Sequence, residues 1–257
     1  MAEAVLETHA LTHSFGELRA VDEVSLSFGA GDMTGLIGPN GAGKTTLFNL
    51  LAGELRPETG RVDLLGQDIS RMPPEQRFTS GLARTFQIPR PFKRMSVLEN
   101  VMLSPPDQGG ESLFWPVFAR ARTARQEARI RARALEVLDF VTLLPLADHP
   151  AGKISGGQMK LLELARVLMG DPKVILLDEP AAGVNPALTE VLIDKIKELN
   201  RAGTSFVIIE HDMDFVMGHC DPIIAMAQGR VVFQGTAREA QSSPLLLDAY
   251  LGTPVDA

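Results

Sequence analysis

The first third of the chain carries short apolar runs that are typical of strands. Residues 5–15 favour a strand, residues 20–28 place apolar side chains on alternate positions, and residues 33–38 (MTGLIG) are mostly apolar. Alternation indicates a strand with one buried face, whereas a short apolar run indicates a strand buried on both faces. A glycine-rich turn then leads into a predicted helix, Lys44–Ala52. Further strands are predicted at residues 61–65 and 82–87.

From residue 155 onward, predicted helices and apolar strands alternate. The predicted order is a helix from Ser155 to Met169, a strand at 174–177, a helix at 187–200, a strand at 205–209, a short helix and a hairpin at 223–235. In the helix at 187–200, apolar residues recur at three- and four-residue steps, so one face is suited to packing on a sheet. Short apolar strands between amphipathic helices predict an α/β fold with a mostly parallel, doubly covered sheet.

The middle of the chain has a different pattern. Between about residues 88 and 153 prolines are frequent and the apolar residues follow a helical period, with the longest predicted helix at residues 119–140. We therefore expect one α/β core, formed by residues 1–87 and 154–257 and including an antiparallel β segment. A helical subdomain, residues 88–153, interrupts this core.

Composition and charge indicate a globular protein and give no reason to expect nucleic-acid binding. Hydrophobic residues make up 45% and charged residues 22% of the chain, which is ordinary for a globular protein. The net charge of −7 gives no electrostatic reason to expect nucleic-acid binding. The single cysteine, Cys220, cannot form an internal disulfide and is interpreted as a small core residue in a reducing setting.

The sequence predicts no membrane span. The first fifteen residues lack the basic region and apolar stretch of a secretory signal, and no window approaches the roughly 18 to 20 apolar residues that cross a bilayer. We expect that any role at a membrane depends on docking to other subunits.

A phosphate-binding loop is predicted after the third strand. The segment fits the pattern G-x-x-x-x-G-K-[ST] between an apolar strand and a helix, and backbone N–H groups of such a loop converge on phosphates. The helix N-terminus adds partial positive charge. Lys44 would reach the β- and γ-phosphates of ATP, and the Thr45 hydroxyl would bind Mg²⁺. The predicted ATP-binding residues here are Gly38, Pro39, Asn40, Gly41, Ala42, Gly43, Lys44, Thr45 and Thr46.

Two adjacent carboxylates end the predicted strand at 174–177. Asp178 and Glu179 would emerge at the carboxyl edge of the sheet, where open α/β folds bind ligands. Asp178 suits the Mg²⁺ shell, directly or through water. Glu179 is placed to polarise the attacking water as a catalytic residue, together with Lys44. By itself a strand ending in two acids is usually a solvated strand end, but the phosphate loop upstream favours the functional interpretation.

A second glycine-rich helix start narrows the class of ATPase. Residues 154–158 (ISGGQ) place Ser155 as an N-cap and resemble the ABC signature LSGGQ, 19 residues before the strand at Val174. The resemblance implies that this segment caps the γ-phosphate held by a partner subunit, so that ATP lies between two subunits arranged head to tail. The residues so assigned are Ser155, Gly156, Gly157 and Gln158.

The resemblance to the ABC family also implies roles for three further residues. Gln87 looks like the glutamine that lies near Mg²⁺ and water and senses the membrane partner, and His211 looks like the histidine that contacts the γ-phosphate. Phe15 occupies the position of an aromatic residue that stacks on adenine, although aromatic residues on early strands more often belong to the core. The other histidines are interpreted as ordinary polar residues. One departure is Asn185, where many ABC proteins carry an aspartate.

Longer segments resemble one subfamily over nearly the whole chain. ARTFQIPRPFKRMSVLENV, LLDEPAAGVNP, IEHDMDFVMG and DAYLG look like the ATP-binding subunits of branched-chain amino-acid importers of the Liv type, in which AAG-[VL]-NP is the usual form. The resemblance implies a P-loop NTPase fold with a RecA-like core. It also implies a second ATPase subunit, two transmembrane permease subunits, an indirect substrate-binding protein and a place on the cytoplasmic face of the inner or plasma membrane.

The leading prediction is therefore an ATPase, converting ATP and water to ADP and phosphate, that powers an importer. One alternative is an ABC ATPase that acts on soluble partners, such as iron–sulfur cluster assembly, and another is a nucleotide-binding scaffold without turnover. The surface around residues 87–95 is the predicted docking site for the membrane subunits. The arginine-rich segment 120–133 is interpreted as a solvated helix face, with contact to membrane subunits or headgroups as the alternative.

Overall fold

The computed structural model describes residues 3–85, 90–105, 120–243 and 246, and of residues 120–123 it describes the backbone alone. The chain forms two compact units. The first comprises residues 1–87, 173–180 and 199–257, and the second comprises residues 88–172 and 181–198. The predicted division of the chain at residue 153 stays a prediction, and each unit is described below by itself.

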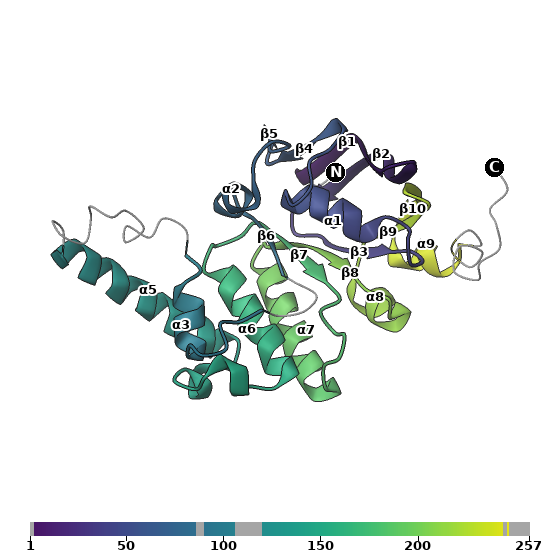
Figure 1. Ribbon diagram of the computed structural model, residues 1–257. Helices are drawn as coiled ribbons and strands as arrows, with labels where there is room; N and C mark the ends of the chain where they lie inside the picture. The colour runs from purple at the N-terminus through teal and green to yellow at the C-terminus, as the bar shows by residue number, and fades with distance from the viewer. Residues whose placement is uncertain (1–2, 86–89, 106–119, 244–245, 247–257) are drawn as a thin grey trace. The chain divides into compact units, whose positions relative to one another are not determined.

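A six-stranded, mostly parallel sheet forms the base of the first unit (Figure 1), in the order β10-β9-β3-β8-β7-β6. The parallel strands are β3 (Met33–Ile37), β6 (Leu82–Arg84), β7 (Val174–Asp178), β8 (Ser205–Ile209) and β9 (Ile223–Ala227), and β10 (Arg230–Gly235) pairs antiparallel with β9. Every residue of β3, β7 and β8 is buried, because a parallel sheet is covered on both faces. The predicted α/β fold is confirmed.

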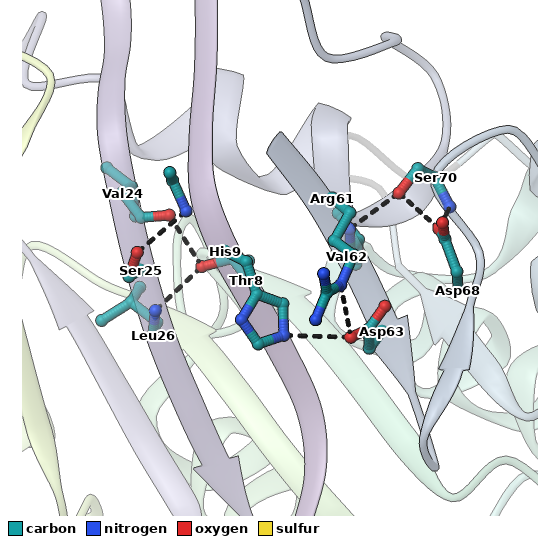
Figure 2. A network of polar contacts seen from close by, with 11 residues as sticks. Thr8, His9, Val24, Ser25, Leu26, Arg61, Val62, Asp63, Asp68 and Ser70 are labelled. Atoms are coloured by element: carbon teal, nitrogen blue, oxygen red, sulfur yellow. Dashed lines mark hydrogen bonds and ion pairs between the residues drawn. The ribbon is translucent and has the colours of Figure 1, made fainter. Parts of the chain in front are cut away.

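An antiparallel sheet, in the order β2-β1-β4-β5, completes the β structure of this unit. Its strands are β1 (Ala4–Phe15), β2 (Leu18–Gly29), β4 (Thr59–Leu64) and β5 (Gln67–Asp68). Side chains reinforce the strand pairing: the Thr8 hydroxyl donates to the Val24 carbonyl and accepts from the Leu26 N–H, and Ser70 Oγ accepts from the Val62 N–H (Figure 2). On the same sheet His9 Nε2 lies 3.0 Å from Asp63 Oδ2.

Helix α1 (Lys44–Ala52) packs between residues of both sheets in one apolar core. Leu47, Phe48, Leu50 and Leu51 are fully buried and belong to a cluster that includes side chains of β1 and β3. This burial fixes the helix that follows the phosphate loop. The shorter helices of the unit are α2 (Pro74–Thr79), α8 (Met213–His219) and α9 (Ala237–Gln241).

A buried cation caps the C-terminal end of α1. Arg77 on α2 is 1% exposed, and its guanidinium donates to the carbonyl oxygens of Leu50 and Leu51, at 2.6 Å each, and of Met72 and Ser70. Burial lowers the pKa of Arg77 to about 10. Because the last carbonyls of a helix carry partial negative charge and need donors, this cation stabilises the end of α1.

The second unit is helical. It contains α3 (Val97–Met102), α5 (Arg120–Phe140), α6 (Gly156–Leu168), the 3₁₀ turns η2 (Leu144–Leu146) and η3 (Ala151–Lys153), and α7 (Pro186–Arg201) up to Glu198. Figure 1 shows α3, α5 and α6 grouped together, and all three contact one another. Among the described residues, we find no helix that combines the length and the apolar character needed to cross a membrane.

Candidate functional site

The phosphate loop has a backbone that glycine alone accommodates at two positions. Gly38 has φ +148°, and a Cβ atom there would lie 2.2 Å from the carbonyl oxygen of Met226. Gly43 has φ +98°, and its Cβ would lie 2.1 Å from the carbonyl oxygen of Ala20. Both contacts are with backbone, which cannot give way as a flexible side chain can. The glycines of the motif therefore allow the loop to pack directly against β2 and β9.

The loop continues directly into α1, whose N-terminus is free of negative charge. The first turn of α1 contains no acidic side chain. Lys44 is buried, and its ammonium group donates to the carbonyl oxygens of Gly38 (2.7 Å) and Pro39 (3.0 Å). Burial lowers the pKa of Lys44, while the charges of Glu179 and Asp178 oppose that shift. The loop thus combines a helix N-terminus with a nearby cation, which is the chemistry that binds phosphate.

The two acidic residues come to the same edge of the sheet. Asp178 is the last residue of β7 and is 5% exposed, and its Oδ2 accepts a hydrogen bond of 2.9 Å from Arg84 Nη2. Glu179 follows with φ +48°, held by a hydrogen bond from its N–H to the Ile209 carbonyl. Its Oε1 lies 2.8 Å from His211 Nε2. The structure therefore brings Glu179 and His211 together although they lie 32 positions apart along the chain.

One cavity of about 320 Å³ contains most of the predicted site. It is lined by the phosphate loop, the acidic strand end, the histidine and the first hairpin, namely Phe15, Leu18, Ala20, Asn40, Gly41, Ala42, Gly43, Lys44, Thr45, Thr46, Asp178, Glu179, Ile209 and His211. Phe15 is 53% exposed and is therefore not a core residue, and the ring of His13 contacts its ring edge-on at 4.9 Å. An exposed aromatic ring and a polar, cation-bearing loop in one cavity suit a ligand with a flat base and phosphates.

The signature segment begins α6 in the helical unit. Ser155 is the N-cap: its Oγ accepts from the Gln158 N–H, and Gln158 Oε1 accepts from the Ser155 N–H. A Cβ on Gly157 would lie 2.7 Å from Leu188 Cδ1, so α6 packs closely against α7 at this point. A Cβ on Gly156 would lie 4.0 Å from the Gly183 carbonyl oxygen, with no closer contact among the residues that the structure describes. Gln87, the remaining predicted site residue, lies outside the described residues.

Sequence reasoning missed two polar residues at this edge of the sheet. Arg84 ends β6 and contacts both Asp178 and Asn49, which lies on α1. The sequence does place an arginine within a predicted strand. Its contact with the acidic strand end follows only once β6 is known to pair with β7.

Comparison with known proteins shows the family of the chain. Residues 21–182 match the family described as ABC transporter. The chain belongs to this family. It is 40% identical over 248 residues to the probable branched-chain amino acid transport ATP-binding protein LivG of Archaeoglobus fulgidus, covering 96% of this chain and 95% of that protein. The high-affinity LivG protein of Escherichia coli is 37% identical over 253 residues, covering 98% and 99%.

Solved structures of ABC cassettes have the same fold. A nucleotide-free ATP-binding cassette from an ABC transporter is 38% identical with a TM-score of 0.84, covering 96% of this chain and 99% of that one. The ADP conformation of another such cassette is 37% identical with a TM-score of 0.83, covering 98% and 100%. A cassette described as dimeric, bound to ADP and phosphate, is 24% identical with a TM-score of 0.73, covering 91% and 99%, and shows the fold alone.

These findings confirm the predicted resemblance and fold. The protein is an ABC transporter ATPase of the LivG type, in which ATP hydrolysis is coupled to transport.

Proposed function

We propose that this ABC cassette binds ATP with Mg²⁺ in the cavity described above and hydrolyses it to power import of branched-chain amino acids or related small solutes. The observation that carries the proposal is the meeting of four features in one cavity: the phosphate loop, Lys44, the acidic strand end and His211. In P-loop NTPases these parts position the nucleotide and neutralise the charge that develops on the transferred phosphoryl group.

Each side chain has a distinct part in this proposal. The phosphate loop and Lys44 bind the β- and γ-phosphates, and Glu179 orients a water molecule in line with the γ-phosphate. His211, 2.8 Å from Glu179, fixes that carboxylate and contacts the γ-phosphate. Phe15 stacks on adenine at the exposed end of the cavity.

The donor set fits a magnesium ion. Thr45 and Asp178 line the same cavity and offer hydroxyl and carboxylate oxygens, and no cluster of three or more His, Cys, Asp or Glu side chains suited to a metal occurs among the described residues. Mg²⁺ prefers oxygen ligands and is commonly held by one or two protein groups plus substrate phosphates and water. When bound, it would neutralise phosphate charge. Gln87 stays a predicted ligand near Mg²⁺.

The partners are proposed on the same basis. Ser155–Gln158 would cap the γ-phosphate bound by a second cassette arranged head to tail, since the N-terminus of α6 is a second anion-binding helix end. A solved cassette of the same fold is described as dimeric. Two transmembrane permease subunits and, indirectly, a substrate-binding protein would complete the importer. The cassette would then lie on the cytoplasmic face of the inner or plasma membrane.

The cargo rests on the LivG relatives, whose names give branched-chain amino acid transport. The alternative is an ABC ATPase with soluble partners, such as iron–sulfur cluster assembly. Affinity purification of the tagged chain from membranes and from cytosol separates the two. Recovery of permease subunits from the membrane fraction is expected, whereas recovery with soluble partners alone would favour the alternative.

Phosphate release by the purified chain tests hydrolysis. The wild type is expected to release phosphate from ATP with Mg²⁺. Glu179→Gln should lower the rate by about 100-fold or more and leave ATP binding intact, because the amide cannot accept a proton from water. The matched control is Glu127→Gln, which changes an exposed glutamate on α5 and should turn over normally. A wild type that binds ATP without turnover would support the scaffold instead.

A further inference from the structure

Arg84 joins the strand that carries Asp178 to the helix that carries Thr45. It is the last residue of β6 and lies opposite Leu176 of β7, two residues before Asp178. Its Nη2 donates to Asp178 Oδ2 at 2.9 Å, and its Nη1 donates to Asn49 Oδ1 on α1 at 2.6 Å. One guanidinium group therefore bonds the two elements from which the proposed magnesium ligands project.

The surroundings of this arginine are mostly dry. The Arg84 side chain is 11% exposed and that of Asp178 is 7% exposed. The guanidinium carbon lies 5.7 Å from the centre of the Phe48 ring, and Nη1 also lies 3.2 Å from Oε1 of the partly exposed Glu54. Buried charges are stable in proteins when they are paired and hydrogen-bonded. A planar guanidinium can donate in two directions at once, which the ammonium group of lysine does less well.

We propose that Arg84 is a positioning residue for magnesium binding, which holds the Asp178 carboxylate in register with Thr45 by bonding Asp178 and Asn49 together. This inference rests on the proposed binding of ATP with Mg²⁺ to the cavity. Carboxylates that ligate metals are themselves hydrogen-bonded by neighbouring groups, and loss of such a neighbour typically lowers metal affinity by 10- to 100-fold. Arg84 also provides the buried Asp178 with a cationic partner when no metal ion is bound.

The direction in which Mg²⁺ affinity changes when the Arg84 guanidinium is removed distinguishes a positioning role from simple charge repulsion. A cation beside a metal ligand repels Mg²⁺, so its removal would tighten Mg²⁺ binding if repulsion dominated. If positioning dominates, removal leaves Asp178 mobile and unpaired, and Mg²⁺ binding weakens. The proposal therefore predicts weaker Mg²⁺ binding in variants that lack the guanidinium.

The experiment is an equilibrium titration of Mg²⁺ at a fixed, subsaturating concentration of a fluorescent ATP analogue, on the full chain, with nucleotide binding as the readout. Arg84→Met is expected to raise the Mg²⁺ concentration for half-maximal binding by about tenfold or more. Nucleotide binding in EDTA should be nearly unchanged, since Arg84 does not line the cavity. The proposal would be overturned if a folded Arg84→Met protein reached half-maximal nucleotide binding at an unchanged or lower Mg²⁺ concentration.

Two further variants keep the test decisive if Arg84→Met does not fold. Arg84→Lys retains the positive charge but lacks the planar guanidinium group. It should therefore raise the Mg²⁺ concentration for half-maximal binding by an intermediate factor. Asn49→Ala removes the anchor on α1 and should also raise the Mg²⁺ concentration for half-maximal binding. Its effect should be less than additive with that of Arg84→Lys, because both residues act through one network. Wild-type Mg²⁺ dependence in both variants would overturn the proposal.

The matched control is Arg61→Met. Arg61 also pairs with an aspartate, Asp63, at 2.9 Å (Figure 2), but both residues lie on β4 of the antiparallel sheet and neither lines the cavity. Its removal should leave Mg²⁺ dependence unchanged. Failure of the proposed function would be distinct, because the wild type itself would then show no Mg²⁺-dependent nucleotide binding.

Discussion

At the scale of single residues, Glu179 combines chemistry with an unusual backbone. Its φ of +48° is a conformation that residues other than glycine rarely adopt, and it occurs immediately after the buried strand β7. The hydrogen bond from its N–H to Ile209 ties this turn to β8, which leads to His211. Such backbone strain persists where surrounding structure compensates for it, often at functional sites. Here the turn directs the carboxylate to the histidine.

Phe15 gives the first prediction at this scale. Because the ring is half exposed at the cavity, Phe15→Ala should weaken ATP binding by about 1–3 kcal/mol through lost base stacking. It should leave the denaturation midpoint nearly unchanged. Calorimetric titration and urea unfolding measure the two quantities. Phe15→Trp should restore affinity, and Leu65→Ala serves as a control at another exposed apolar residue. A large loss of stability with normal affinity would instead indicate a structural role.

At the scale of elements, the loop at residues 90–95 is anchored in the helical unit while its tip stays exposed. The buried Asn100 on α3 accepts from the Phe92 N–H at 2.8 Å and donates to the Phe92 carbonyl at 3.2 Å. Phe92 itself is 54% exposed, and Arg90 and Arg94 are exposed beside it. An exposed aromatic ring with flanking arginines on a loop anchored in this way has the composition of a binding surface.

We predict that this loop docks to the membrane subunits. A triple variant with alanine at Arg90, Phe92 and Arg94 should recover less of the permease subunits in affinity purification. It should also lose the increase in ATPase rate that accompanies transport. The basal ATPase of the isolated chain should be unchanged, because these residues lie outside the cavity. Alanine at Arg129 and Arg131, exposed on α5, is the control and tests whether the arginine-rich helix is only a solvated face. Unchanged recovery of the triple variant with permease would remove the loop as a docking site.

At the scale of the whole molecule, the proposed mechanism places ATP between two chains. The phosphate loop and Glu179 belong to one compact unit, whereas Ser155–Gln158 begins α6 in the other. The departure at Asn185, noted from the sequence, lies immediately before α7, where its Oδ1 accepts from the Ala187 N–H. In this chain Asn185 therefore supports the start of a helix through its side chain.

The corresponding prediction concerns oligomeric state. With ATP and Mg²⁺, Glu179→Gln should elute as a dimer in size-exclusion chromatography with light scattering, because ATP stays bound between the subunits when it is not hydrolysed. A second change, Ser155→Arg, should return this variant to the monomer by placing a large side chain at the start of α6. The same Glu179→Gln protein without nucleotide provides the reference. A monomer at saturating ATP would refute the head-to-tail arrangement.

Local features of the site were predictable because their signal is contiguous in sequence. The phosphate loop, the N-cap Ser155 and helix Lys44–Ala52 depend on residues within a few positions of one another. Predictions failed where the signal was weak or tertiary: β6 ends at Arg84, before the predicted strand end at residue 87, and β4 ends at Leu64 because Leu65 turns with φ +51°. The two-residue strand β5 and the one-and-a-half-turn helix α2 carry too few residues for a periodic pattern.

By itself, the sequence determined the family, the α/β fold and the identity of the phosphate-binding and acidic residues, since motif chemistry and hydrophobic period are local properties. Only the tertiary structure decided which residues meet. Glu179 faces His211, Phe15 is exposed at the cavity, and Arg84 bonds Asp178 across 94 positions. These contacts depend on strand order and side-chain direction, which no short stretch of sequence specifies.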